Sequence, residues 1–78
     1  MKDEMQDASY GEKAVGLFDQ EINRDVIKCK KTFALIIDNL NNLRDSTEDP
    51  EVMRMASIAI SEAQTSQMWA VKAITWKD

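Results

Sequence analysis

The sequence predicts an all-α fold: an antiparallel two-helix hairpin with a short N-terminal arm, assembling into a homo-oligomer. Three observations lead to this expectation. Two long segments repeat apolar residues at alternating spacings of three and four, the polar stretch RDSTEDPE separates them, and both glycines lie before residue 17. With 78 residues the chain is one domain with a small core.

Residues 1–19 are expected to form a loosely ordered N-terminal arm with room for one helical turn. They show no sustained period, and they contain Gly11 and Gly16. The arm also carries two aromatic residues, Tyr10 and Phe18. Residues 20–78 then make up the helical hairpin.

The first long helix is expected at about residues 23–45. Its apolar residues form a heptad seam over three repeats, made of Ile22, Val26, Cys29, Phe33, Ile36, Leu40 and Leu43. A second apolar row lies beside the seam and consists of Ile27, Ala34, Leu35 and Ile37. Asn23 is the expected N-cap, because its side chain can accept from the free backbone amides of the first turn.

A turn is expected at residues 46–49 and a second helix at about residues 50–76. Pro50 suits the first helical position and Asp49 the N-cap before it. One seam of this helix is Met53, Ala56, Ile60, Ala63, Gln67, Ala70 and Ile74. The other is Val52, Met55, Ala59, Glu62, Ser66, Trp69, Ala73 and Trp76.

The two helices carry more apolar surface than they can cover on each other, because each presents two apolar rows. The remaining rows must meet another copy of the chain or the folded-back arm. Five alanines in the second helix permit close approach of helix backbones. We therefore infer a homo-oligomer, and the spacing leaves its stoichiometry open.

Composition excludes several classes of function. A net charge of −4 argues against binding a nucleic-acid polymer, and no apolar run has the length of a membrane span. There is no histidine and a single thiol, so we expect no metal site, no disulfide, no cofactor and no enzymatic activity. Cys29 lies on the seam and is interpreted as an inert thiol, and an intracellular protein is expected.

Two groups of residues are candidates for binding a ligand. On a helix, Thr65, Trp69, Lys72 and Trp76 share one stripe, where a cation between indoles can hold a phosphate while a ring stacks on a base. In the alternative interpretation, both indoles anchor an oligomer and Lys72 extends past them.

The second group lies at the start of the first helix and consists of Arg24, Lys28, Lys30 and Lys31. Tyr10 or Phe18 of the arm can reach this cluster and close over a nucleotide bound by Lys28 or Lys31. The alternative is a solvated helix face beside a frayed tail.

Three stretches resemble a known family: GEKAVGL (residues 11–17), the long segment from Phe33 to Trp76, and within it AQTSQMWAVKA (residues 63–73). They are similar to the small phage proteins that sequester cyclic nucleotides, the anti-CBASS sponges, whose helical-hairpin domain is shared with the Thoeris anti-defence sponges. The likeness is greatest to the short form carried by large tailed phages of enterobacteria.

The resemblance implies a homohexamer that acts in the host bacterial cytoplasm without turnover. Its expected ligands are cyclic dinucleotides such as cyclic GMP-AMP and, in some members, cyclic trinucleotides at separate sites. It also implies that an arm aromatic, Phe18 or Tyr10, stacks on the dinucleotide while Lys28 or Lys31 meets its phosphates. Lys72, with Thr65 as a companion, matches the trinucleotide position.

The arm departs from the family pattern. Relatives with A-V-G-L often continue with a Phe-Asn-Pro-Ser turn, whereas this chain reads FDQEINRD without a proline. The stacking residue therefore stays open between Phe18 and Tyr10. A helical protein–protein interaction module without a nucleotide ligand is the alternative function.

Overall fold

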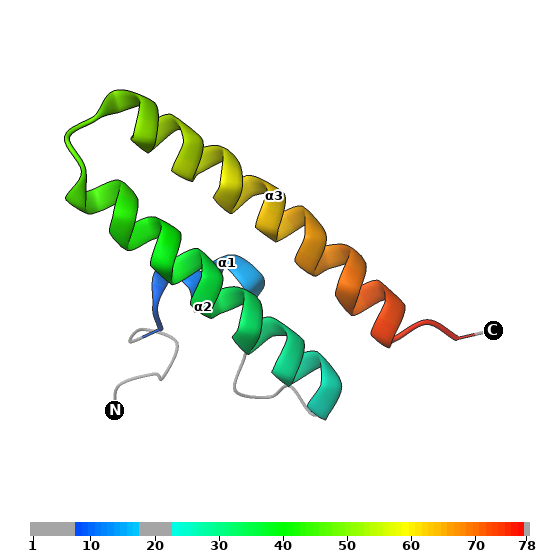
Figure 1. The fold of residues 1–78 in the computed structure, drawn as a ribbon. Helices are drawn as coiled ribbons and strands as arrows, with labels where there is room; N and C mark the ends of the chain where they lie inside the picture. Colours follow the sequence, from blue (N-terminus) through cyan, green and yellow to red (C-terminus); the bar gives the residue numbers. More distant parts are fainter. Residues whose placement is uncertain (1–7, 18–22, 78) are drawn as a thin grey trace.

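The computed structural model describes residues 8–17 and 23–77, and in these ranges the chain forms three helices and no strand (Figure 1). The helices are α1 (Tyr10–Val15), α2 (Arg24–Ser46) and α3 (Pro50–Ile74). The predicted all-α class is confirmed.

Helix α1 is more ordered than the sequence analysis indicated, because both of its ends are capped. Ser9 Oγ accepts from the Glu12 amide at 3.0 Å, and Glu12 Oε1 accepts from the Ser9 amide at 2.8 Å, which together make a capping box. Gly16 ends the helix with a left-handed φ of 68°, and its amide donates to the last turn. A helix of six residues is not stable alone, so α1 depends on the surface beneath it.

The two long helices begin where the sequence predicts. Asn23 Oδ1 accepts from the amides of Asp25 and Val26 at 3.0 and 3.1 Å, which confirms the first N-cap. The Asp49 carboxylate accepts from the Glu51 amide at 2.9 Å, with Pro50 as the first helical residue, which confirms the second. Helix α3 ends at Ile74, slightly before the expected residue 76.

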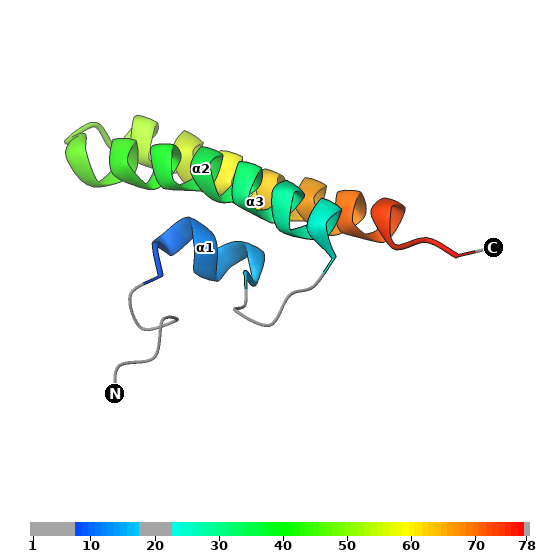
Figure 2. The ribbon, with the colours of Figure 1, turned by 90° about the horizontal axis from the view of Figure 1, so that it is seen from below.

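Helices α2 and α3 lie side by side and run in opposite directions, joined by residues 47–49 (Figure 1). Figure 2 shows α1 lying against one side of this pair. We call the end of the helix pair that contains residues 47–49 the turn end. The opposite end, where α2 begins and α3 finishes, is the open end.

The core is centred on Ile37, which is fully buried and packs with Val15, Ala34 and Ile60. The buried stripe of α2 is therefore shifted from the predicted heptad seam toward the second predicted row, which contains Ala34 and Ile37. Val26 of the seam is buried, and Phe33 and Leu40 pack against the core. Two members of that seam, Ile36 and Leu43, are 44% and 47% exposed. The reason is that α2 has two neighbours, α1 and α3, so its buried stripe lies between the two contacts. On α3 the first predicted seam does face inward, with Ala56, Ile60 and Gln67 buried.

Gly11 fixes how closely α1 approaches α2. A Cβ at this position would lie 2.1 Å from the carbonyl oxygen of Ala34, so only glycine fits without a shift of the backbone. The Gly11 amide donates to Asp38 Oδ1 at 2.7 Å. The close approach and the hydrogen bond occur at the same point of α2.

Polar contacts hold the other end of α1. Lys30 Nζ donates to the Gly16 carbonyl at 3.0 Å, and Gln64 Nε2 donates to the Ala14 carbonyl at 3.4 Å. These bonds satisfy carbonyls that a helix leaves unpaired in its last turn. Helix α1 is thus tied to both long helices.

Candidate functional site

A hollow of about 320 Å³ lies on the outer edge of α2, near the open end. It is lined by Arg24, Ile27, Lys28, Lys31, Thr32 and Leu35. Arg24, Lys28, Lys31 and Leu35 are spaced by four, three and four residues, so successive turns of the helix place them on one stripe. The structure therefore brings together Lys28 and Lys31, the two lysines singled out from the sequence.

The chemistry of this hollow suits an anion with an apolar portion. Lys28 and Lys31 are both exposed and supply compact positive charges, while Arg24 can bind a phosphate through two parallel hydrogen bonds. Leu35, 66% exposed, adds an apolar surface. Thr32 contributes little, because its hydroxyl donates to the Lys28 carbonyl at 2.9 Å.

A second hollow, of about 370 Å³, adjoins the first and shares Lys31 and Leu35 with it. Its other lining residues are Ser9, Glu12, Ala34 and Asp38, so α1 forms one wall. The carboxylate of Glu12 accepts a hydrogen bond from the Ser9 amide, and that of Asp38 accepts one from the Gly11 amide. The position of α1 therefore shapes the space beside Lys31.

Within the described residues, neither predicted arm aromatic lines the first hollow, which contains Lys28. The Tyr10 ring lies under Arg44, with the guanidinium carbon 5.5 Å from the ring centroid. Arg44 follows Lys28 by more than four turns of α2, a separation of about 24 Å at 1.5 Å per residue. Phe18 lies outside the described residues.

Two indoles and a lysine gather at the open end, where Trp69 and Lys72 lie on α3 and Trp76 follows its end. Lys72 Nζ lies 5.6 Å from the Trp69 ring centroid and 6.0 Å from that of Trp76, and the three residues line a hollow of about 310 Å³ with Ala73. Both indoles are about two-thirds exposed. The predicted cation between two rings is therefore present in the folded chain. Thr65 does not line this hollow, and its hydroxyl donates to the Ser61 carbonyl at 3.2 Å.

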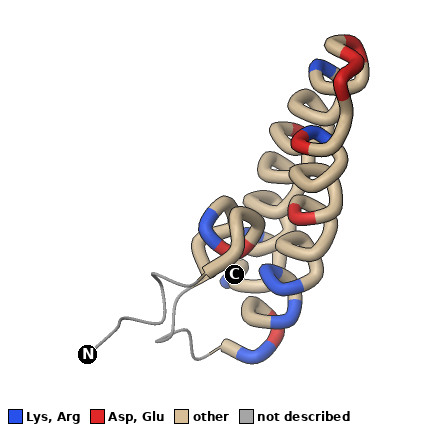
Figure 3. Tube along the Cα trace, turned by 90° about the vertical axis from the view of Figure 1, so that its left-hand side faces the viewer, with Lys and Arg blue, Asp and Glu red and all other residues tan. Residues whose placement is uncertain are grey.

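The two candidate groups point away from each other in a single chain. Lys28 precedes the buried Ile37 by nine residues, which is two and a half helical turns, so it lies on the opposite side of α2. Trp69 follows the buried Ile60 by the same spacing on α3. Both groups nevertheless lie at the open end, where Figure 3 shows most of the Lys and Arg colouring. One chain thus presents two separate sites at one end.

The part that α1 takes in shaping the site was not predicted from the sequence. One signal was available: Ser9 and Glu12 have the S-x-x-E spacing of a capping box. The placement of Tyr10 beside Arg44 had no local signal, because it depends on how α1 docks. Cys29 is half-buried, on the stretch of α2 between Lys28 and Lys30.

Comparison with known proteins finds no match to a family model, to a curated protein or to a solved structure. Among the helices formed by residues 8–17 and 23–77, none combines the length and apolar character needed to cross a bilayer. The side chains of the two sites and the resemblance of the second-helix motif are therefore the basis for a functional proposal.

Proposed function

We propose that the chain is a non-enzymatic sponge that binds and sequesters cyclic dinucleotides such as cyclic GMP-AMP. In this proposal it acts in the cytoplasm of a host bacterium and starves CBASS effectors of their signal. The observation that carries the proposal is the hollow in which Arg24, Lys28 and Lys31 surround an apolar surface. The resemblance of AQTSQMWAVKA to the anti-CBASS sponges supports the choice of ligand.

The energetics favour a pocket completed by a second subunit. Each charge-assisted hydrogen bond to a phosphate contributes about 1.5–3 kcal/mol, and each stacked base about 1–3 kcal/mol. Nanomolar binding needs about 12 kcal/mol after ordering costs, which exceeds what one shallow hollow supplies. We therefore propose that the helical hairpins assemble into a homo-oligomer, the hexamer implied by the resemblance.

The stacking aromatic belongs to the same proposal. Tyr10 of one chain lies beside Arg44, far from the Lys28 of that chain, so a Tyr10 that reaches the hollow must come from a neighbouring subunit. Phe18 of either chain is the other candidate. In both cases the ring covers the base while Lys28 and Lys31 hold the phosphates.

The group on α3 supports a second site in this proposal. Lys72 lies between two exposed indoles and can meet a phosphate while a base stacks on either ring. The resemblance assigns this position to cyclic trinucleotides. Thr65 would take part only after releasing its hydrogen bond to the Ser61 carbonyl.

Isothermal titration with 3′,3′-cyclic GMP-AMP tests the proposal. We expect saturable heat with fewer than one ligand bound per chain, because each pocket takes groups from two subunits. Intact nucleotide should be recovered when the complex is denatured by heat, which distinguishes sequestration from hydrolysis. Absence of heat at high protein concentration would reject the sponge.

A protein–protein interaction module is the second candidate function. The observation that favours it is the exposure of large apolar side chains, above all Leu35, Met68, Trp69 and Trp76 at 65–66%. Such a module needs no nucleotide, so cyclic GMP-AMP should give no binding heat. The titration above separates the two functions.

A further inference from the structure

Helix α2 has an apolar side that neither α1 nor α3 covers. Leu43 follows Ala34 by nine residues, or two and a half turns, and Ala34 is where Gly11 of α1 makes its close approach. Leu43 therefore lies on the side of α2 opposite α1. Ile36 lies about 200° around the helix from Ala34 and so shares that side. The side chain of Leu43 is 47% exposed and that of Ile36 is 44% exposed.

Helix α3 continues this surface. Gln64 marks the side that faces α1, because its amide donates to the Ala14 carbonyl. Met55 precedes Gln64 by nine residues and Ala73 follows it by nine, so both lie on the opposite side of α3. Glu62 interrupts this side in mid-helix, so the apolar part is concentrated near Met55, which is half exposed.

We call the surface made by Ile36, Leu43, Met55 and Ala73 the far face. In Figure 2 it is the side of the α2–α3 pair turned away from α1. Its members come from two predicted apolar rows: Ile36 and Leu43 are exposed members of the α2 seam, and Met55 and Ala73 belong to the second seam of α3. Apolar side chains gathered on one side of a helix pair are typical of an interaction surface.

The charges of the chain are unevenly distributed along the helix pair, and Figure 3 shows most of the Lys and Arg colouring toward the open end. The turn end carries the carboxylates of Asp45, Glu48, Asp49 and Glu51 against Arg44 and Arg54, and Arg54 pairs with Glu51. Among the described residues, the open end carries Arg24, Lys28, Lys30, Lys31, Lys72 and Lys77 against Asp25. Two copies packed in the same direction would bring like charges together, whereas two copies packed in opposite directions bring opposite charges together.

We propose that a second copy of this chain packs on the far face with its α2 antiparallel to the first. The contact is isologous, as in other two-fold dimers, so Ile36 of each copy meets Leu43 of the other. Residues equally distant from the middle of such a pair lie opposite each other. Lys28 of each copy then lies over the turn end of the other, near Glu48 and Glu51.

This contact goes beyond the proposed sponge and needs no nucleotide. The hollow opens on the outer edge of α2, so pairing through the far face leaves Arg24 and Lys31 accessible, while Lys28 lies between the hollow and the far face. The far-face pair is then the unit from which a larger ring or bundle is built. Charge complementarity selects the orientation of this unit, and the apolar side chains stabilise it.

The mass of the protein without ligand gives the first test. By light scattering we expect Ile36→Glu and Leu43→Glu to lower the mass at least two-fold, while circular dichroism shows retained helicity. The matched control is Asn42→Glu, which adds the same charge to an exposed position about a quarter turn from Leu43 and should keep the wild-type mass. A wild-type monomer, or an unchanged mass for both far-face variants, would overturn the proposal.

Zero-length carbodiimide cross-linking of mixed ¹⁴N- and ¹⁵N-labelled chains tests the orientation. Lys28 and the carboxylates of the turn end lie at opposite ends of α2, about 30 Å apart along the helix, so a link between them must join two chains. We expect mixed-isotope links from Lys28 to Glu48 or Glu51. Mixed links only from Lys28 to Asp25 would mean parallel packing and overturn the proposal. Neither test involves a nucleotide. A wild-type monomer would also count against the sponge, because its pocket takes groups from two subunits, whereas failure of the far-face variants or of the cross-links alone leaves the sponge in place.

Discussion

The backbone amide of Gly11 donates a hydrogen bond to the Asp38 carboxylate, with 2.7 Å between nitrogen and oxygen. At the same point, a Cβ on residue 11 would lie 2.1 Å from the Ala34 carbonyl oxygen. The contact between α1 and α2 thus depends on a glycine, which has no Cβ, at residue 11 and on the carboxylate of Asp38. Both can be changed separately.

We expect Gly11→Ala to lower the free energy of unfolding by about 1–3 kcal/mol, because the added methyl group forces α1 away from Ala34. Urea titration followed by circular dichroism measures this change. Lys13→Ala, at an exposed position of the same helix, is the control and should stay within about 0.5 kcal/mol of wild type. Equal stabilities of the two variants would show that the close approach does not matter.

Asp38→Ala leaves the buried Gly11 amide without its acceptor, which should reduce stability by about 1–3 kcal/mol. Asp38→Asn retains a side-chain oxygen and should lose less. Hydrogen exchange at the Gly11 amide provides a local readout, and we expect faster exchange in the alanine variant than in the asparagine variant. The same exchange rate in both variants would contradict a stabilising bond.

Truncation of the fully buried Ile37 should be the most damaging change in the core. Ile37→Ala leaves a cavity between all three helices, and such changes lower stability by about 2–5 kcal/mol. Thermal unfolding measures the loss. In parallel, Leu35→Ala at a 66% exposed position should lower the melting temperature far less, and the reverse order would mean that the core lies elsewhere.

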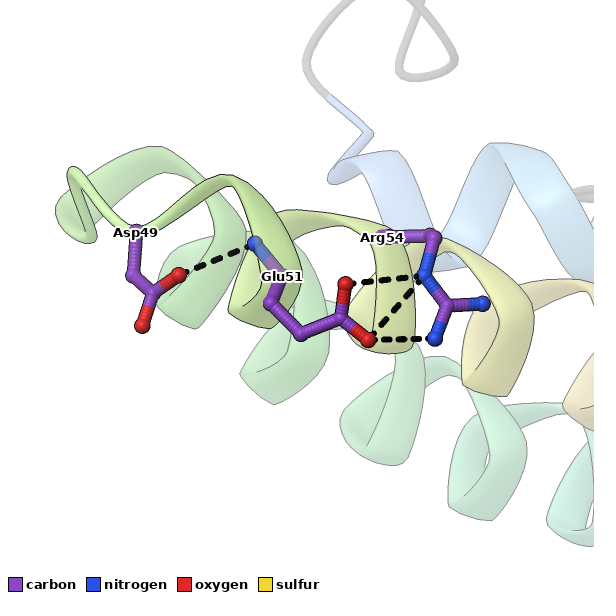
Figure 4. Close-up of polar contacts among 3 residues, drawn as sticks. All are labelled: Asp49, Glu51 and Arg54. Carbon is purple, nitrogen blue, oxygen red and sulfur yellow. Dashed lines mark hydrogen bonds and ion pairs between the residues drawn. The ribbon is translucent and has the colours of Figure 1, made fainter.

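An ion pair at the start of α3 makes a prediction about pH (Figure 4). Arg54 Nε donates to both Glu51 carboxylate oxygens at 3.2 and 3.1 Å, and a terminal guanidinium nitrogen also donates to Oε1. These hydrogen bonds hold the pKa of Glu51 below its usual value, against a smaller opposing effect of desolvation. The stabilisation is therefore present above the usual pKa and is lost as the pH falls through the lowered one.

In an NMR titration of the Glu51 carboxyl carbon, Arg54→Ala should raise the pKa toward that of an ordinary glutamate. Lys13→Ala, at an exposed position of α1, should leave it unchanged. Both groups are exposed to solvent, so the shift should shrink in high salt. A Glu51 pKa that does not respond to Arg54→Ala would rule out this pair in solution.

For the proposed sponge, Lys28→Ala should weaken binding of cyclic GMP-AMP by about 10- to 100-fold, as expected for one charge-assisted hydrogen bond to phosphate. Calorimetry measures the affinity, and light scattering should show that the chains still assemble, because Ile36 and Leu43 of the far face are unchanged. Lys13→Ala removes an exposed lysine outside the hollow and should bind as wild type. Normal binding by Lys28→Ala would reject the assignment of the hollow while leaving the ligand class open.

The helix ends could be predicted because their signals are local. Asn23 and the Asp49–Pro50 pair cap amides only two or three residues away, so the sequence contains the whole interaction. The buried stripe of α2 could not be predicted from its spacing, because heptad positions do not show which side a third helix will cover. Docking of α1 through Gly11 turns Ile37 inward and leaves Ile36 exposed.

In the candidate sites too, features set by spacing along one helix could be predicted, and features set by contacts between distant segments could not. The stripe of Arg24, Lys28 and Lys31 follows from residues one turn apart, as does the placement of Lys72 beside Trp69, whereas Trp76 approaches Lys72 from beyond the end of α3. The partner of Tyr10 does not, since the Arg44 contact joins segments that are distant in the sequence. Local spacing was enough for groups on one helix and not for groups on two.

The contacts that hold α1 also determine when it can form during synthesis. Its amide bond to Asp38 spans 27 residues, and the bond from Gln64 to the Ala14 carbonyl spans 50. Helix α1 therefore leaves the ribosome well before its binding surface is complete. Translation that stops before Asp38 should release a chain whose α1 lacks its acceptor on α2, and translation that stops before Gln64 leaves the Ala14 carbonyl without its donor on α3.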